Sequence, residues 1–217
     1  MRVLILGATG AVGGQLLAES LARATITSVI APTRRPLPPH PKLINPVLDF
    51  SEADAEADFW HVDVALCALG TTRKQAGSDA AFIKVDKDIP IAVAQCVLAK
   101  NAHTFGLVSS VGARLGRNLY LNTKAELELA LQALGFAHTV IVRPSLIDAH
   151  RADRRPGESL GLWLAKALGK LLPARYRPVP PAVIAKALLN ASLAKPVVQG
   201  STTTTLESEQ LKKIAES

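Results

Sequence analysis

A serine, a tyrosine and a lysine near the middle of the chain have the types and the spacing of a proton-transfer site. Tyr120 and Lys124 lie four residues apart in LYLNTKAELE, which has helical character, so both side chains are expected on one face of a helix. The phenol of a tyrosine has a reference pKa of about 10, and a neighbouring ammonium lowers that pKa because it stabilises the phenolate. Ser110 stands at the carboxyl end of an expected strand, from which its hydroxyl can hydrogen-bond a reacting oxygen. We therefore expect these three residues to be catalytic.

This trio is suited to moving a proton onto or off an oxygen while a nicotinamide cofactor transfers a hydride across the same C–O bond. In that arrangement Lys124 also holds the nicotinamide ribose. Tyrosine and lysine at this spacing also occur by chance, and the alternative is a half-buried aromatic side chain beside a solvated lysine. A cofactor-binding loop elsewhere in the chain makes coincidence the weaker explanation.

A glycine-rich loop stands near the start of the chain, in GATGAVGG at 7–14. Gly7, Gly10 and Gly13 follow the apolar stretch RVLIL and open a helical pattern at 11–23. The dinucleotide fingerprint requires this strand–loop–helix context, because glycines let the backbone approach a pyrophosphate that the helix N-terminus attracts. The pattern differs from the commoner GxGxxG by one inserted residue. The alternative is a tight turn that joins a strand to a helix and binds nothing.

The residues after the second expected strand favour NADP(H) over NAD(H). NAD-binding sheets place a carboxylate about 20 residues beyond the glycines, where it binds the ribose hydroxyls. This chain has Thr33, Arg34 and Arg35 at that place and no acidic residue nearby. A carboxylate there repels a 2′-phosphate, whereas guanidinium groups bind it in bidentate fashion. The alternative is a pair of solvated surface arginines.

Two further strand ends belong to the expected cofactor site. Asp49 and Phe50 follow the third strand and are expected to flank the adenine. Leu69, Gly70 and Thr71 follow the fourth strand, where they let the backbone pass close to the cofactor.

Strands and helices alternate along most of the chain, which predicts an α/β fold with a Rossmann-like, doubly wound parallel sheet. We expect strands at 3–6, 26–31, 43–48, 62–69, 105–110 and 138–144. We expect helices at 11–23, 51–58, 79–101 with an interruption at Pro90, and 120–134. Residues 1–144 are expected to form the NADP-binding core with the Ser/Tyr/Lys site. Residues 145–217 are expected to form a small C-terminal substrate lobe, integrated with the core into a single domain.

The expected lobe contains apolar helices at 159–171 and 181–194 and closes with a strand and a short helix from STTTTLES onward. The two helices suit closure over the cofactor, plain core, or the face of a dimer. A monomer or a homodimer is expected. Arg151, Arg154 and Arg155 precede these helices and suit either a clamp for a phosphate or acidic substrate, or a solvated loop.

Composition argues against several classes of protein. The formal net charge is +7, yet aromatic residues make up only 4% of the chain and do not alternate with basic ones, which disfavours nucleic acid as a partner. The chain has no uninterrupted apolar run of about eighteen residues, so no membrane span is expected. Two cysteines in apolar surroundings fit buried free thiols, and five histidines have no ligand spacing. We expect a cytoplasmic protein without a bound metal.

Taken together, the motifs resemble the atypical short-chain dehydrogenases/reductases, in particular the Tat-interacting-protein-like family of NADPH-binding oxidoreductases. The resemblance rests on GATGAVGG, ALGTTR, KVDKDIP, SS…YLNTK, VRPSLI and RRPGES, and it covers nearly the whole chain. One departure is Asp86, which stands where many extended dehydrogenases have an asparagine. The resemblance implies that NADPH is held by Thr9, Gly10, Ala11, Val12, Arg34, Arg35, Leu69, Gly70, Tyr120, Lys124, Pro144, Ile147 and Arg155.

Two functions follow from these observations. The first is an NADPH-dependent oxidoreductase that transfers a hydride to or from a small carbonyl or hydroxyl compound, or a sugar-nucleotide-like substrate. The second, which the resemblance also implies, is an NADPH-sensing regulatory protein whose cofactor occupancy sets its affinity for a protein partner. The oxidoreductase is the favoured hypothesis, because Ser110, Tyr120 and Lys124 accompany the cofactor loops. Under the second hypothesis Tyr120 is dispensable.

Overall fold

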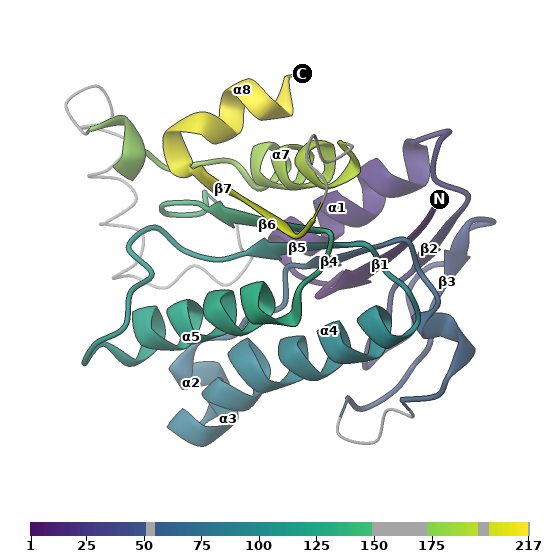
Figure 1. Ribbon diagram of the computed structural model, residues 1–217, viewed down its shortest axis with the longest axis horizontal. Coiled ribbons are helices and arrows are strands. Elements are labelled where there is room, and N and C mark those ends of the chain that lie inside the picture. Colours follow the sequence, from purple (N-terminus) through teal and green to yellow (C-terminus); the bar gives the residue numbers. More distant parts are fainter. Residues whose placement is uncertain (51–54, 149–172, 195–199, 217) are drawn as a thin grey trace.

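In the described part of the chain, seven strands form one parallel sheet at the centre of the molecule (Figure 1). The structure is a computed structural model, and it describes residues 1–50, 55–148, 173–194 and 200–216. The strands lie in the order β3-β2-β1-β4-β5-β6-β7. Their bounds are β1 Arg2–Leu6, β2 Ser28–Ile30, β3 Leu43–Ile44, β4 Val64–Cys67, β5 Thr104–Val108, β6 His138–Arg143 and β7 Thr202–Glu207.

The strand order of the sheet reverses between β1 and β4, which is its topological switch point. From β1 the chain builds outward through β2 and β3, and then crosses back to place β4 on the other side of β1. Val3 to Leu6 of β1 pair in register with Val64 to Cys67 of β4. The carboxyl ends of these two strands therefore flank the crevice in which doubly wound sheets bind their ligands.

Helices cover both faces of the sheet (Figure 1). α1, α7 and α8 lie on one face, and α4 and α5 lie on the other. The helix bounds are α1 Ala11–Ala22, α2 Arg73–Ala76, α3 Asp79–Ile83, α4 Ile89–Ala99, α5 Leu119–Leu134, α7 Pro181–Leu193 and α8 Leu211–Ala215. Short 3₁₀ turns lie at Asp58–Trp60, Ala174–Tyr176 and Ser208–Gln210, and a π-helical turn lies at Lys84–Asp88.

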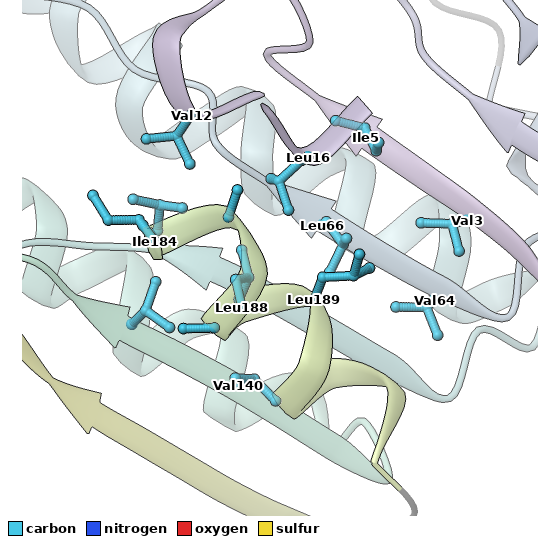
Figure 2. Packing of buried hydrophobic residues seen from close by; sticks show 14 of the residues in the cluster. Val3, Ile5, Val12, Leu16, Val64, Leu66, Val140, Ile184, Leu188 and Leu189 are labelled. Atoms are coloured by element: carbon cyan, nitrogen blue, oxygen red, sulfur yellow. The ribbon is translucent and has the colours of Figure 1, made fainter. Parts of the chain in front are cut away.

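Alternate residues of a strand face the two helical layers, as the two-residue period of a strand requires. In β1, Val3 and Ile5 belong to the hydrophobic cluster on the side of α1 and α7, whereas Leu4 and Leu6 belong to the cluster on the side of α4 and α5. Figure 2 shows the first cluster, in which Leu188 of α7 lies over the strands. Burial on both faces explains why the strand sequences are continuous apolar runs.

α7 is a helix of the core. Ile184, Leu188 and Leu189 are fully buried, and the helix packs against α1, β5 and β6. Gly106 of β5 permits this close packing, since a Cβ atom there would lie 2.6 Å from Ser192 Oγ. Of the three roles considered for this segment, the structure supports plain core. The second apolar helix, expected at 159–171, lies outside the described residues.

The long helix expected over 79–101 is divided into α3, a π-helical turn and α4. Pro90 explains the division, because it lacks an N–H and its ring crowds the carbonyl group four residues earlier, which is that of Asp86. In a π turn the backbone hydrogen bonds span five residues instead of four. The turn therefore accommodates Pro90 at a position where it could not form the usual α-helical hydrogen bond. The short helix α2 was not expected.

Other bounds also differ from the expectation. The strand expected at 43–48 ends at Ile44, because Pro46 lacks an N–H, and one bridge between Thr33 and Val47 follows. The strand expected at 26–31 is regular only over β2. Of the helix expected at 51–58, residues 51–54 lie outside the described residues, and residues 55–57 are not helical.

Within the described residues, no helix is long and apolar enough to cross a membrane. The same residues contain no group of three His, Cys, Asp or Glu side chains that could hold a metal ion. Cys67 and Cys96 are both free thiols. Cys67 is buried as expected, but Cys96 is only half-buried, because it lies on a partly exposed side of α4.

Candidate functional site

The glycine loop connects the carboxyl end of β1 to α1 and lies against the end of β4. Gly7 has a φ of +82°, and a Cβ atom on it would lie 2.7 Å from the carbonyl oxygen of Ala68. A Cβ atom on Gly13 would lie 1.9 Å from the carbonyl oxygen of Gly7. Glycine at these two positions therefore lets the helix, the loop and two strands approach more closely than side chains would permit.

The N-terminus of α1 is open at the carboxyl edge of the sheet. Its N-cap residue is Gly10, no side chain caps the helix, and its first turn has no acidic residue. Thr9, Gly10 and Ala11 are exposed, whereas Val12 is buried in the core and anchors the helix. N–H groups without a side-chain cap, at the positive end of the helix dipole, make this place suitable for a phosphate group.

The loop after β4 brings the expected cofactor residues to the expected catalytic lysine. The backbone N–H of Thr71 donates to Asp86 Oδ2 at 2.7 Å. A Cβ atom on Gly70 would lie 3.3 Å from Asp86 Oδ1 and 3.8 Å from Lys124 Nζ. Leu69, which precedes Gly70 in this loop, is half-buried against the cluster under α4. The loop that follows β4 and the side chain of Lys124 therefore lie next to each other at the carboxyl edge of the sheet.

Lys124 and Asp86 form a buried ion pair. Lys124 Nζ lies 2.8 Å from Asp86 Oδ1, and the two side chains are 5% and 1% exposed. Burial is the largest single influence and lowers the pKa of Lys124. The charge of Asp86, the nearby Tyr120 and the hydrogen bond to Asp86 together outweigh burial, so the pKa of Lys124 is raised above its usual value. The lysine is therefore buried and charged, which differs from the solvated lysine of the alternative interpretation.

The π-helical turn directs Asp86 into the site. Asp86 is the one buried residue of the five in that turn. Lys87, next to it, forms an ion pair of 2.8 Å with Glu126 of α5. The turn is therefore attached to α5 at two points, through Asp86 and through Lys87. π-Helical turns shift the direction of following side chains and are frequent at functional sites.

Tyr120 lies in the first turn of α5, one turn before Lys124. It is 39% exposed, and its ring centroid lies 6.2 Å from that of Phe82 and 5.9 Å from Lys124 Nζ. The helix begins here because the side chain of Asn118 accepts a hydrogen bond from the N–H of Leu121 at 3.0 Å. The phenol ring is thus accessible to a small molecule, whereas the lysine behind it is shielded from water.

Ser110 follows β5 at the same edge of the sheet. Its hydroxyl donates a long hydrogen bond of 3.4 Å to the carbonyl oxygen of Val111. The N–H of Val111 in turn donates to the carbonyl oxygen of Pro144 at 2.9 Å. The structure therefore brings the expected catalytic Ser110 beside Pro144, a residue expected along the nicotinamide.

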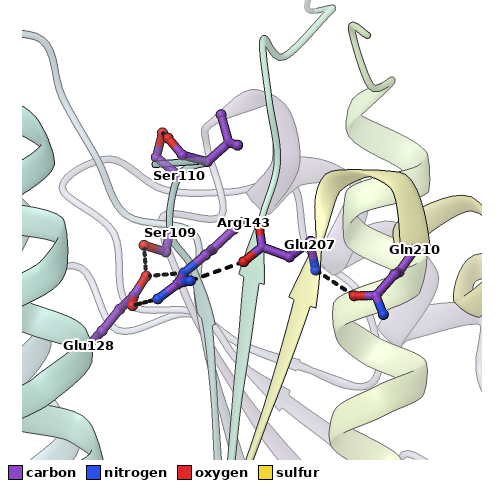
Figure 3. Close-up of polar contacts among 7 residues, drawn as sticks. Ser109, Ser110, Glu128, Arg143, Glu207 and Gln210 are labelled. Atoms are coloured by element: carbon purple, nitrogen blue, oxygen red, sulfur yellow. Dashed lines mark hydrogen bonds and ion pairs between the residues drawn. The ribbon is translucent and has the colours of Figure 1, made fainter. Parts of the chain in front are cut away.

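A second buried carboxylate lies on α5, behind the Tyr/Lys pair. Glu128 accepts hydrogen bonds from Arg143, at 3.1 Å from Nε and 2.5 Å from Nη2. Glu128 also accepts a hydrogen bond from the hydroxyl of Ser109. Arg143 Nη1 donates to Glu207 of β7 at 3.0 Å (Figure 3). The network joins the ends of β5, β6 and β7 to α5, directly beside Ser110.

The sequence-based prediction missed this network. The hydrogen bonds from Arg143 to Glu128 raise the pKa of Arg143, so its guanidinium is charged at every ordinary pH. A signal for Glu128 was present, since it follows Lys124 by four residues and shares its helix face. Arg143 had no comparable signal, because its partners depend on how β6 lies relative to α5 and β7.

The expected adenosine-binding residues lie beyond the ends of β2 and β3. Arg34 and Arg35 are exposed, and neither forms an ion pair with any residue that the structure describes. Asp49 is exposed, and Phe50 is half-buried. Phe50 lines a small apolar hollow together with Ile89 of α4.

Two contacts expected from the C-terminal part of the chain have different outcomes. Ile147 is described, and it forms an isolated parallel bridge with Val179. Arg155 lies outside the described residues, as does the whole arginine-rich segment 151–155.

Relatives of this chain are found among known sequences. No family model matches the chain. It is 36% identical over 197 residues to the protein HTATIP2 of Rattus norvegicus, covering 87% of this chain and 79% of that protein. It is 34% identical over 178 residues to the protein fmp52, mitochondrial, of Emericella nidulans, covering 78% of this chain and 76% of that protein.

Solved structures with the same fold include enzymes that bind NAD. The short-chain dehydrogenase/reductase YIR035C of Saccharomyces cerevisiae matches with a TM-score of 0.70 at 13% identity, covering 98% of both chains. MoeE5, solved in complex with UDP-glucose and NAD, matches with a TM-score of 0.70 at 16% identity, covering 95% of this chain and 76% of that one. These likenesses establish the expected Rossmann-like α/β fold.

Proposed function

Because this chain belongs to the HTATIP2/FMP52 family of atypical short-chain dehydrogenases/reductases, we propose that it is an NADPH-dependent oxidoreductase. Its reaction is the transfer of a hydride to or from a small carbonyl or hydroxyl compound. The observation that carries the proposal is the position of Lys124 Nζ, 3.8 Å from a Cβ atom built on Gly70. The buried ammonium of Lys124 therefore lies beside the loop that follows β4, at the edge where doubly wound sheets bind nucleotides.

The residues at the carboxyl edge fit a dinucleotide. The uncapped N-terminus of α1 suits the pyrophosphate, and the close approach at Gly7 and Gly13 leaves the loop without side chains in the way. Beyond β2, Arg34 and Arg35 are exposed and have no acidic partner in the described chain, so both guanidiniums are available for a 2′-phosphate. We therefore assign NADPH as the preferred cofactor.

The side chains divide the chemistry among them. The nicotinamide, when bound, supplies or accepts the hydride. In the direction of reduction, Tyr120 donates its phenolic proton to the reacting oxygen, and Ser110 donates a hydrogen bond to the same oxygen. The ammonium of Lys124 stabilises the phenolate that remains. Asp86 holds that ammonium in place through the ion pair, and the N–H of Thr71 donates a hydrogen bond that holds Asp86.

The proposal is tested by titrating the protein with NADPH and NADH and by following NADPH oxidation with a panel of aldehydes, ketones and one UDP-sugar. We expect tighter binding of NADPH, turnover of at least one carbonyl compound, and loss of turnover in Tyr120→Phe with cofactor binding retained. Absence of binding of either nucleotide would overturn the proposal. Turnover that persists unchanged in Tyr120→Phe would remove Tyr120 from the mechanism.

One observation favours a second function, that of an NADPH-sensing regulatory protein. The charge of Lys124 is compensated by Asp86 at 2.8 Å, which weakens the assistance that the lysine gives to Tyr120. A protein that only reports NADPH does not need that assistance. In this case binding of a protein partner changes with NADPH, is lost in Arg34→Ala/Arg35→Ala, and is unchanged in Tyr120→Phe.

The cellular compartment remains a prediction. A reducing compartment, which we identify as the cytoplasm, is consistent with the free thiols of Cys67 and Cys96. The fungal relative carries the word mitochondrial in its name. Fractionation of cells that produce the tagged protein separates the two compartments.

A further inference from the structure

The segment that carries the two arginines follows a break in the sheet. Beyond β2 and β3 the parallel pairing resumes, because Thr33 N donates to Pro46 O at 3.0 Å and Leu48 N donates to Thr33 O at 3.0 Å. In an uninterrupted parallel ladder, the N–H of residue 46 would donate to the carbonyl oxygen of Ala31. Residue 46 is a proline and has no N–H. The carbonyl group of Ala31 must therefore find its donor elsewhere.

Asn45 supplies the missing donor from its side chain. Its Nδ2 donates to the carbonyl oxygen of Ala31 at 2.6 Å and to Thr33 Oγ1 at 2.8 Å. Its Oδ1 accepts the N–H of Leu37 at 2.8 Å. The orientation of this amide is forced, because Leu37 N can only donate and the carbonyl oxygen of Ala31 can only accept. One side chain thus bridges both ends of the segment 31–37.

Thr33 extends the same chain of hydrogen bonds to the arginines. Its hydroxyl accepts from Asn45 and donates to the carbonyl oxygen of Arg35 at 2.7 Å. Thr33 is buried, whereas Arg34 and Arg35 are exposed and lack ion-pair partners among the described residues. The backbone of the segment is therefore fixed from beneath, while both guanidiniums face solvent.

We propose that Asn45 is a positioning residue that sets the preference for NADPH over NADH. It does so by holding the segment 31–37 in the shape that presents Arg34 and Arg35 to the 2′-phosphate. This inference rests on the cofactor assigned above. Fixing the backbone before the ligand arrives lowers the entropic cost of ordering two long side chains on binding. NADH lacks the 2′-phosphate, so its affinity does not depend on this arrangement.

The test compares dissociation constants for NADPH and NADH, measured by cofactor fluorescence, in the wild type, Asn45→Ala and Thr33→Val. We expect the dissociation constant for NADPH to rise about tenfold in Asn45→Ala, while that for NADH changes by less than about twofold. Thr33→Val keeps the size of the side chain, and it is expected to raise the dissociation constant for NADPH by a smaller factor. If Asn45→Ala does not fold, Thr33→Val alone tests the inference.

Asn190→Ala is the matched control. Asn190 also bridges chain segments through its amide, donating to the carbonyl oxygen of Ile214 at 2.9 Å, but it lies on α7 away from the arginine segment. We expect the ratio of the two dissociation constants to be unchanged in this variant. Equal losses of NADPH and NADH affinity in Asn45→Ala, or no loss of either, overturn the inference.

The double variant Arg34→Ala/Arg35→Ala separates the inference from the cofactor assignment. If the double variant loses the NADPH preference and Asn45→Ala and Thr33→Val keep it, the inference alone is wrong. If the double variant keeps the wild-type ratio, the assignment of the 2′-phosphate to these arginines is wrong, and the role of Asn45 is rejected with it.

Discussion

The carboxylate of Asp86 and the ammonium of Lys124 lie 2.8 Å apart, and both side chains are almost completely buried. The pair links two segments that are far apart in the chain, the π-helical turn and α5. It also has a third member, because Thr71 N donates to the other carboxylate oxygen. Removing one partner of such a pair leaves the other charge buried and unpaired. The free energy lost in this way is larger than the net contribution of the intact pair to stability.

Asp86→Asn and Lys124→Met are each expected to lower the free energy of unfolding by about 3–5 kcal/mol. The double variant is expected to lose less than the sum, by about 1–3 kcal/mol, because neither charge remains unpaired. Urea unfolding of the four proteins measures this coupling. Additive losses would mean that the two groups do not interact in solution.

Alkaline pH is expected to destabilise the protein through Cys67. Burial raises the pKa of the Cys67 thiol from 9.0 to about 11. Between pH 9 and pH 11 the folded state keeps the thiol proton while the unfolded state loses it. The contribution of Cys67 to stability is therefore fully present below pH 9 and is lost as the pH rises toward 11. A shift of this size corresponds to about 2–3 kcal/mol.

Cys67→Ala tests this pH dependence. The variant loses stability at every pH because of the cavity, so only the difference between pH 8 and pH 10.5 is compared. We expect that difference, from urea unfolding at about these two pH values, to be smaller in the variant than in the wild type. An equal difference in both proteins would assign the alkaline loss to other groups.

Glu128→Gln is expected to be far more damaging than Glu207→Gln, although both carboxylates bind Arg143. The side chain of Glu128 is 4% exposed and that of Glu207 is 34% exposed. We expect a loss of about 3 kcal/mol for the buried position and less than about 1 kcal/mol for the exposed one. Thermal unfolding of the two variants measures the contrast, and equal values would show that burial does not control this network.

Gly7→Ala is expected to disrupt the glycine loop, and Gly77→Ala is its matched control. The two glycines have nearly the same φ, +82° and +85°, so each substitution carries a similar backbone strain of about 1–2 kcal/mol. Only at Gly7 would the new Cβ atom collide with backbone, at 2.7 Å from Ala68 O, whereas nothing lies within 4 Å of it at Gly77.

The collision is expected to add about 1–3 kcal/mol of destabilisation and to abolish NADPH binding in Gly7→Ala. Chemical unfolding and cofactor titration of both variants check the prediction. Loss of NADPH binding in Gly77→Ala as well would indicate that general destabilisation, rather than the shape of the glycine loop, is responsible.

Much of the fold follows from local patterns in the sequence. The apolar runs of β1, β4 and β5 and the helical spacing of Tyr120 and Lys124 were recognisable because strand and helix periodicity act over a few residues. The glycine loop was recognisable for the same reason, since glycines that follow an apolar strand and open a helix are adjacent in the chain.

The partners of the buried charges were decided only by tertiary structure. Asp86 meets Lys124 because a π turn before Pro90 rotates it toward α5, and Glu128 meets Arg143 because β6 lies beneath the same helix. Asn45 replaces a backbone N–H that only the pairing of β2 with β3 makes necessary. Local sequence determines which elements form, whereas long-range packing determines which charged and polar groups come within hydrogen-bonding distance and away from water.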